Sequence, residues 1–378
     1  MLREFRIYRK AAELPENWNS TVGIQNILLT REYFSALEES GPKNMDCYFA
    51  GFFLNGELVG GALFQCLDFR RHSTFQKDTV SFSIRNVLTR LFSKNVMILG
   101  NNMLTGQNGF YFNLSGISAG EVISWINEAS RHIQKMAGRT SIVMFKDYRP
   151  DFAAFFNQKS YRHYHRFSVQ PNMVLSLRPD WKCFEDYLND ISKKYRARAR
   201  TARRKLEGIH VREMDLHQVT SQRIRINELY YHVAENALFN TFFLAENHFE
   251  SMKVHLGDHF RIFGYFSGEE LIGFYTLILN HGDVDTYFLG YDKNLQKPKQ
   301  LYLNMLLDMV EFGIRQRFKR IIFGRTALEI KSTVGAAPVE IVGLIRHTHP
   351  VINLFMEKVF SSVSPKADWI QRNPFKKD

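Results

Sequence analysis

The stretch DVDTYFLGYD (residues 283–292), followed by LYLNMLLDMVEFGIRQR (301–317) and RIIFGR (320–325), gives the clearest indication of fold class in this chain. The first piece alternates as a strand does, the second repeats apolar residues at helical spacing, and the third is a short apolar strand. A strand, a long helix and a second strand in this order are typical of an α/β fold. The sequence therefore predicts an α/β fold with a mixed sheet.

The same order of elements is expected in both halves of the chain. The second half is predicted to contain further strands at 208–214, 260–266, 270–280 and 339–345, and helices at 181–192, 221–236, 245–257 and 327–333. The first half is predicted to contain strands at 3–10, 47–54, 57–69, 95–100, 140–147 and 161–177, and helices at 31–41, 80–92, 119–136 and 150–161. Asn55-Gly56 between two apolar runs is a strong hairpin signal.

The chain is long enough for two domains. At 378 residues it exceeds the size at which a single hydrophobic core keeps growing. We therefore expect one α/β domain over residues 1–177 and a second over 178–378. A basic helix at 192–208 is expected at the start of the second domain.

The segment SKKYRARARTARRKLEG (192–208) has eight basic residues and no acid between Lys193 and Lys205, in a chain whose net formal charge is +12. Helical spacing places Ile191, Tyr195, Ala199, Ala202 and Leu206 on one face, which predicts an amphipathic helix seated on a domain. A solvated charged face is one reading. Like charges repel along a helix, however, which favours a bound polyanion. The candidate polyanion-binding residues are Lys194, Arg196, Arg198, Arg200, Arg203 and Arg204.

The pieces WKCFEDYLNDISKKYRARARTARRK, YFLGYD and RIIFGRTALEIKSTVGAAP carry a family resemblance through their order and spacing. Together with the repeated plan, they resemble acyltransferases of the GNAT superfamily. Two such domains joined by a basic helical segment look like the tandem Fem-like branch, the peptidoglycan-bridge aminoacyltransferases and their relatives. This resemblance implies transfer of an acyl or aminoacyl group to an amine or hydroxyl of a small molecule or cell-envelope precursor.

The strand at 283–292 holds the candidate catalytic residues. Alternation is expected to place Asp283, Asp285, Tyr287, Leu289 and Tyr291 on one face. Asp285 is the candidate base, acting directly or through water, and Tyr287 or Tyr291 the candidate acid. The resemblance implies that this strand lines the acyl site and that a backbone N–H holds the carbonyl oxygen. The alternative is that the aspartates belong to a turn and the tyrosines are ordinary strand residues.

The donor is left open by the sequence. Members of the superfamily that use acetyl-CoA or another acyl-CoA usually carry a Q/RxxGxG/A loop before the long helix, whereas KNLQKPKQLYLN (293–304) has no glycine. Lys297, Lys299 and Gln300 are the residues there that could hold an anionic donor. The corresponding place in the first half, FNLSGISAGEV (112–122), has two glycines but not the motif spacing. Acyl-CoA and aminoacyl-tRNA therefore both stay candidate donors.

The segment FGRTALEIKSTVG (323–335) follows a predicted strand end, where ligands of α/β sheets commonly bind. Arg325 and Lys331 are the candidate cations for an anionic substrate there. The Fem-like resemblance also points to this segment, because related proteins have a similar Phe-Gly followed by a lysine. A purely structural pairing of Lys331 is the alternative.

Other classes of protein are disfavoured. Three cysteines without CxxC spacing, and the pairs His163/His165 and His347/His349 without a third ligand, predict no metal site. Neither GxSxG nor a zinc or helix-turn-helix motif is present, so a covalent serine mechanism and duplex DNA binding are not expected. No signal peptide or membrane span is predicted, and we expect a cytoplasmic protein.

Two functional classes therefore remain. The first is an acyltransferase. The second is a non-catalytic protein with the same fold that recognises RNA or an anionic lipid surface through the basic helix.

Overall fold

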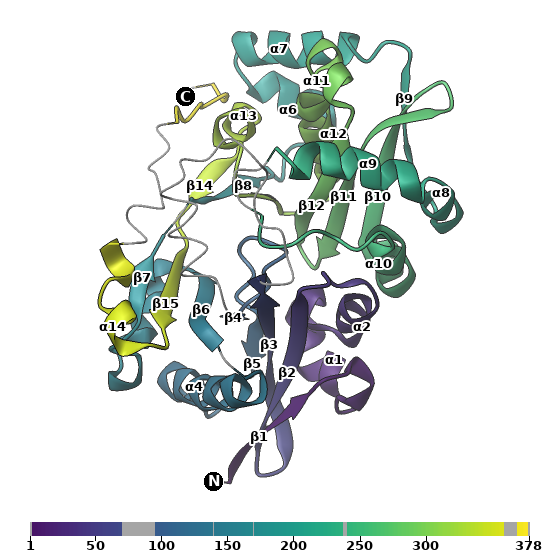
Figure 1. The fold of residues 1–378 in the computed structure, drawn as a ribbon. Coiled ribbons are helices and arrows are strands. Elements are labelled where there is room, and N and C mark those ends of the chain that lie inside the picture. The colour runs from purple at the N-terminus through teal and green to yellow at the C-terminus, as the bar shows by residue number, and fades with distance from the viewer. Residues whose placement is uncertain are drawn as a thin grey trace. The chain divides into compact units, whose positions relative to one another are not determined.

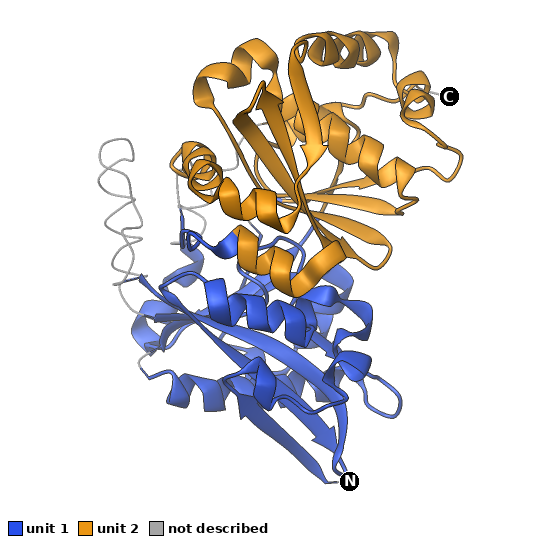
Figure 2. Cartoon of the chain, turned by 90° about the vertical axis from the view of Figure 1, so that its right-hand side faces the viewer, with its two compact units in different colours: residues 1–170, 238–248, 340–366 blue, residues 171–237, 249–339, 367–378 orange. Residues whose placement is uncertain are grey.

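The computed structural model describes residues 2–69, 95–138, 140–168, 170–236, 240–358 and 369–376 (Figure 1). The helix predicted at 80–92 lies outside these residues. The chain forms two compact units (Figure 2). Unit 1 consists of residues 1–170, 238–248 and 340–366, and unit 2 consists of residues 171–237, 249–339 and 367–378.

Unit 1 contains a mixed sheet in the order β1-β2-β3-β4-β6-β15-β7, with β5 paired to β3. Its strands are β1 (Arg3–Tyr8), β2 (Met45–Leu54), β3 (Glu57–Asp68), β4 (Asn95–Leu99), β5 (Phe110–Phe112), β6 (Thr140–Tyr148), β7 (His165–Phe167) and β15 (Val342–His347). The predicted hairpin is confirmed, because Asn55 and Gly56 join β2 to β3 with positive φ angles of 51° and 85°. These angles are the ones that a tight hairpin turn needs.

The helices of unit 1 are α1 (Trp18–Thr21), α2 (Arg31–Ser40), α4 (Ala119–Met136), α5 (Pro150–Ala153) and α14 (Pro350–Asn353). The long helix α4 begins with a capping box, in which Ser118 and Glu121 satisfy each other's backbone N–H groups. Its apolar face, which includes Ile126 and Ile133, packs on sheet residues such as Phe52 to form the core.

Unit 2 contains a mixed sheet in the order β14-β8-β13-β12-β11-β10-β9. Its strands are β8 (Asn172–Ser176), β9 (Ile209–Glu213), β10 (Phe260–Ser267), β11 (Glu270–Asn280), β12 (Asp283–Tyr291), β13 (Arg320–Gly324) and β14 (Ala337–Val339). Among the described strands of this sheet, β12 and β13 are the pair that runs parallel. The long helix between them buries Met305, Leu306 and Val310 in the core of the unit.

The helices that accompany this sheet are α6 (Phe184–Asp190), α7 (Lys193–Arg204), α8 (Leu216–Ser221), α9 (Arg223–Ala234), α10 (His248–Leu256), α11 (Lys293–Lys299), α12 (Leu301–Arg315) and α13 (Leu328–Thr333). Helix α7 is the predicted basic helix. Its predicted apolar face is confirmed, since Ala199, Ala202 and Leu206 are buried in the core of unit 2. Helix α11 was not predicted.

Each sheet contains one strand that the predicted domain boundary at 177/178 assigned to the other domain. The single strand predicted at 161–177 is two strands, of which β7 joins the sheet of unit 1 and β8 lies between β13 and β14 in unit 2. The strand predicted to complete the second half is β15, which instead lies between β6 and β7. An apolar strand pattern specifies burial but not the sheet that provides it, so local pattern did not reveal this exchange.

The packing of α9 on β12 generates a prediction at Gly290. A Cβ at this position would overlap the backbone of Leu229 and Tyr230. We expect Gly290→Ala to lower the free energy of unfolding by about 1–3 kcal/mol or more, because backbone cannot move aside as a side chain can. Urea denaturation measures the change.

The matched control is Gly282→Ala, where a Cβ would meet only the side chain of Lys319, at 3.3 Å. Its expected effect is within roughly 0.5 kcal/mol. Equal effects of the two substitutions would contradict the close packing of α9 on β12.

Candidate functional site

The parallel strands β12 and β13 separate before β12 ends. They pair from Asp283↔Arg320 to Asp285↔Ile322, and no pair follows. Strand β12 nevertheless continues for six residues, to Tyr291. The separation lies at the carboxyl ends of both strands, which is where ligands commonly bind in α/β sheets. We call the region bounded by residues 286–291 of β12 and by the end of β13 the strand wedge.

A β-bulge marks the start of the wedge on β12. Tyr287 and Phe288 together lie opposite the single residue Thr276 of β11, because the register shifts between Tyr275↔Leu289 and Leu277↔Thr286. The buried hydroxyl of Thr276 donates a hydrogen bond of 2.7 Å to the carbonyl oxygen of Phe288. This bond fixes the bulged backbone. A bulge bends its strand and interrupts the ladder, which accounts for the departure of β12 from β13.

The bulge also corrects the predicted arrangement of side chains on β12. Asp285 pairs with Ile278 and Tyr291 pairs with Gly273, and these two partners lie on opposite faces of β11. Asp285 and Tyr291 therefore do not share a face, although strict alternation predicted that they would. The extra residue in the bulge reverses the alternation for Leu289 and Tyr291.

The three predicted catalytic residues accordingly have different surroundings. Asp285 is buried and accepts a hydrogen bond of 3.1 Å from the amide of Asn280. The ring of Tyr287 lies 6.4 Å from that of Phe260, centroid to centroid. The ring of Tyr291 lies 6.4 Å from that of Tyr302 on α12, and burial raises the pKa of Tyr291.

Lys331 lies at the other side of the wedge, on α13. Its Nζ donates to the carbonyl oxygens of Arg325 (2.6 Å) and Gly324 (3.3 Å), which are the residues at the end of β13. The side chain is buried, and burial lowers its pKa to about 7. Among the residues that the structure describes, no carboxylate forms an ion pair with it. A buried lysine without a countercharge is a candidate functional group.

The backbone between β13 and α13 is strained. Thr326 and Ala327 adopt positive φ angles of 66° and 46°, directly after Gly324 at 73°. Non-glycine residues in this region cost about 1–3 kcal/mol each, and such strain gathers at functional sites. The strained turn aims the carbonyls of Gly324 and Arg325 at Lys331. The predicted cations Arg325 and Lys331 are therefore brought together, through the main chain of Arg325.

The start of α12 lacks a glycine loop. Helix α11 runs almost directly into α12 through Gln300, a left-handed residue with φ 48° and ψ 44°. Residues 293–304 contain no glycine, so the backbone there cannot approach a pyrophosphate as closely as a glycine loop does. Lys297 and Lys299 lie on α11, and Lys299 Nζ donates to the carbonyl of Glu207 (3.2 Å).

The glycine-containing segment of unit 1 (112–122) leads into α4, whose start is capped by the chain itself. The N-terminus of α4 is occupied by Glu121, whose carboxylate accepts from the backbone and hydroxyl of Ser118 and pairs with Arg3. Hydrogen bonds from Ser118 contribute most to lowering the pKa of Glu121 to about 2. An internal carboxylate therefore completes the capping box at this helix start.

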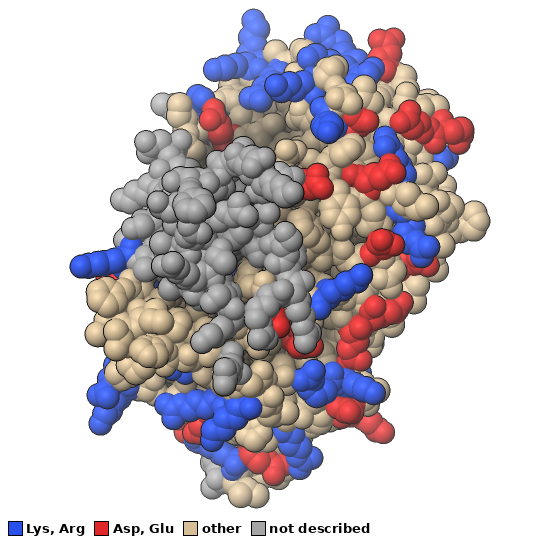
Figure 3. Space-filling view, viewed as in Figure 1, with Lys and Arg blue, Asp and Glu red and all other residues tan. Residues whose placement is uncertain are grey.

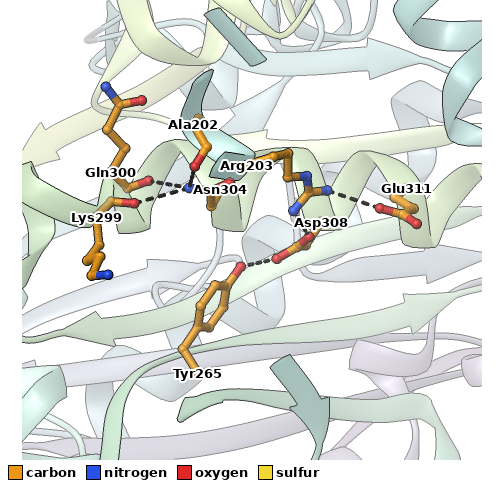
Figure 4. Close-up of polar contacts among 8 residues, drawn as sticks. All are labelled: Ala202, Arg203, Tyr265, Lys299, Gln300, Asn304, Asp308 and Glu311. Atoms are coloured by element: carbon orange, nitrogen blue, oxygen red, sulfur yellow. Dashed lines mark hydrogen bonds and ion pairs between the residues drawn. The ribbon is translucent and has the colours of Figure 1, made fainter. Parts of the chain in front are cut away.

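The basic helix α7 is tied to α12 by a polar network (Figure 4). Arg203 forms ion pairs with Asp308 and with Glu311, the latter at 3.0 Å, and Tyr265 donates to Asp308. The amide of Asn304 donates to the carbonyl of Ala202, at 2.9 Å. The pair of Arg203 and Asp308 is partly buried, so Arg203 helps to hold α7 on α12. The repulsion expected between like charges along the helix is therefore reduced at Arg203, because acids outside the helix neutralise it.

The remaining predicted cations of α7 are engaged less. Arg200 pairs with the exposed Glu185, Arg196 bonds to the amide of Asn189, and Arg204 bonds to the hydroxyl of Thr201. Lys194 lies over the ring of Tyr195, and Arg198 lines a small recess of about 10 Å³ together with residues of α12 and α13. Figure 3 shows Lys and Arg side chains gathered over α7, at the top of the view. The helix therefore presents cations beside the helices that flank the strand wedge.

Several residues of the site were not singled out by the sequence. Thr276 is a lone hydroxyl within the apolar strand ELIGFYTLILN, and this was the available signal. Asn304 and Asp308 lie on the predicted α12, but their partners come from α7 and β10, which sequence spacing does not reveal.

The described parts of the chain contain no cluster of three His, Cys, Asp or Glu side chains able to hold a metal ion. No helix there combines the length and hydropathy needed to cross a bilayer.

Comparison with solved structures identifies the fold as tandem GNAT. The structure of FemX superposes with a TM-score of 0.55 at 10% identity, covering 94% of this chain and all of that one. A tandem GNAT protein from the clavulanic acid biosynthesis pathway gives a TM-score of 0.51 at 12% identity, covering 92% and 99%. No protein-family model and no curated protein sequence matches the chain. The predicted Fem-like tandem GNAT fold is therefore confirmed as a fold.

The environment of Lys331 generates a prediction about pH. Its pKa falls from 10.5 to about 7 on folding, so between these values the unfolded chain binds one proton more than the folded protein. The stability of the wild type should therefore rise with pH relative to that of Lys331→Met, by about 1.4 kcal/mol per pH unit at most. Urea denaturation of both proteins between pH 7 and pH 10 measures the difference.

The exposed Lys319 provides the matched control, because Lys319→Met should leave this pH dependence unchanged. A constant difference between the wild type and Lys331→Met across the range would show that Lys331 titrates normally.

Proposed function

We propose that unit 2 transfers an aminoacyl or other acyl group to an amine or hydroxyl acceptor within the strand wedge. The observation that carries this proposal is the combination of a bulged strand leaving its parallel partner and the buried Lys331 at the end of that partner. The tandem GNAT fold supports the class of reaction but gives neither donor nor acceptor.

The proposed reaction is direct attack without a covalent enzyme intermediate. The acceptor nitrogen or oxygen bonds to the acyl carbon, the carbonyl oxygen becomes an oxyanion, and the bond to the leaving oxygen or sulfur then breaks. Backbone N–H groups of the bulge at 287–289 would hold the oxyanion, in a place that Thr276 keeps rigid. The proton lost by the acceptor passes to the leaving group.

Lys331 is the proposed proton-transfer and charge-stabilising group. A pKa of about 7 means that both its protonated and neutral forms are populated near neutral pH. This is the condition under which a group exchanges protons most effectively in catalysis. Asp285 stays a predicted base at the last paired position before the wedge, and Tyr287 or Tyr291 a predicted acid.

We favour aminoacyl-tRNA over acyl-CoA as donor. The start of α12 offers Gln300 instead of a glycine loop, which disfavours the pyrophosphate of coenzyme A. Helix α7 carries Lys194, Arg196 and Arg198, of which Arg198 lies beside residues of α12 and α13, and a row of cations suits a polynucleotide backbone. A cell-envelope precursor with a free amine is the acceptor class that we propose to test first.

The test measures transfer of a labelled group from mixed aminoacyl-tRNA, and separately from acetyl-CoA, to amine acceptors that include cell-wall precursors. We expect transfer from aminoacyl-tRNA by the wild type and a loss of about 10²-fold or more in Lys331→Met. Lys331→Arg should restore part of the rate, since it keeps a donor but cannot lose its proton at neutral pH.

Lys319→Met is the control, with unchanged rate expected. Transfer from acetyl-CoA alone would overturn the choice of donor and keep the wedge. Absence of transfer from either donor, with salt-sensitive RNA retention that is lost in a variant with Arg196, Arg198, Arg200 and Arg204 changed to Gln, would instead establish the non-catalytic binding protein.

A further inference from the structure

An apolar tip projects from unit 1 at α14. Four large apolar side chains within five residues are exposed: Val351 (59%), Ile352 (39%), Leu354 (76%) and Phe355 (55%). In a monomeric soluble protein, exposed apolar groups are usually scattered, and a contiguous group of them marks a surface that binds something. We call these four residues the α14 tip.

The tip is held firmly in place. Asn353 is buried between the exposed residues; its Oδ1 accepts from the backbone N–H of His347 (2.7 Å), and its Nδ2 donates to the carbonyl of His163 (2.9 Å). Met356, the next inward residue, is fully buried. The exposure of the tip is therefore a consequence of a fixed local structure: the inward positions are satisfied by packing and hydrogen bonds, and the apolar residues face out.

The surroundings of the tip carry more cations than acids. Residues 152–168 and 341–358, which β7–β15 pairing and Asn353 bring together, contain one acid, the exposed Glu357, and five basic residues, namely Lys159, Arg162, Arg166, Arg346 and Lys358. Arg162 bonds to the ring of His163, Arg166 to Ala153 and Asn157, and Arg346 to Gln134. None of these partners is a carboxylate, and no ion pair of the three arginines occurs among the described residues. The segments around the tip therefore keep a net positive charge.

We propose that the α14 tip docks unit 1 on an anionic lipid bilayer. The four apolar side chains would enter the boundary between headgroups and acyl chains, while Arg162 and its cationic neighbours meet the anionic headgroups. Neither part suffices alone, since a short apolar segment inserts weakly and cations without an apolar anchor bind reversibly. Figure 3 shows a largely uncharged surface at the position that α14 has in Figure 1.

The bilayer fits this surface better than other occupants. RNA would use the cations and could stack a base on Phe355, but it would leave the aliphatic side chains of Val351, Ile352 and Leu354 in water. A second copy of the chain would bring the two cation-rich surroundings against each other, because a twofold interface places the same patch on both sides. Only an anionic bilayer complements the apolar and the cationic parts together.

The test is sedimentation of the full chain with vesicles of phosphatidylcholine alone or with about one third phosphatidylglycerol. We expect binding to the anionic vesicles that is at least about tenfold weaker for Leu354→Ser/Phe355→Ser, because the apolar anchor is lost. Lys159→Gln/Arg162→Gln should also weaken it and reduce its salt dependence.

The matched control is Leu2→Ser/Ile224→Ser, which removes two equally exposed apolar side chains elsewhere (69% and 75%) and should bind as the wild type does. Circular dichroism confirms folding of each variant. The proposal is overturned by absence of binding to anionic vesicles, by equal binding of Leu354→Ser/Phe355→Ser, or by loss only when the cations of α7 are changed. A concentration-dependent dimer that the same double variant dissolves would assign the tip to self-association instead.

Discussion

The hydrogen bond from the Thr276 hydroxyl to the carbonyl of Phe288 fixes a bulge at the point where β12 leaves β13. A continuous parallel ladder would bury the ends of both strands and leave no space for a substrate. Since the bulge ends the pairing at Asp285↔Ile322, backbone groups of β12 lie opposite the end of β13. Gly290 lets α9 pack against the far part of β12, so the strand is supported although it has lost its parallel neighbour.

The charges of unit 2 divide into structural and available ones. Arg203 is matched by Asp308 and Glu311 and holds α7 on α12. Lys331 is the opposite case, because its hydrogen-bond partners among the described residues are main-chain carbonyls, and burial lowers its pKa to about 7. A structural lysine gains stability from a carboxylate partner, whereas an unneutralised one costs stability at neutral pH. Retaining that cost is understandable if the amine takes part in chemistry.

Regular patterns made much of the fold predictable. The helical period placed Ala199 and Ala202 inward, and the alternating and helical patterns located β12, α12 and β13 in order. The bulge opposite Thr276 was not predictable, since it depends on a neighbouring strand and not on the spacing within β12. The acids that neutralise Arg203 lie more than one hundred residues away in sequence. The sheets that β8 and β15 join were not predictable either, because an apolar strand pattern does not specify which sheet the strand pairs with.

An activated carbonyl is expected to bind in the strand wedge between β12 and β13. A structure of the protein with a hydrolysis-resistant aminoacyl-adenosine analogue tests this directly. The acyl carbonyl oxygen should lie within hydrogen-bond distance of a backbone N–H at 287–289, with Lys331 on the opposite side of the analogue. An analogue bound away from β12 and β13, with the space between these strands filled by packed side chains, would contradict the account.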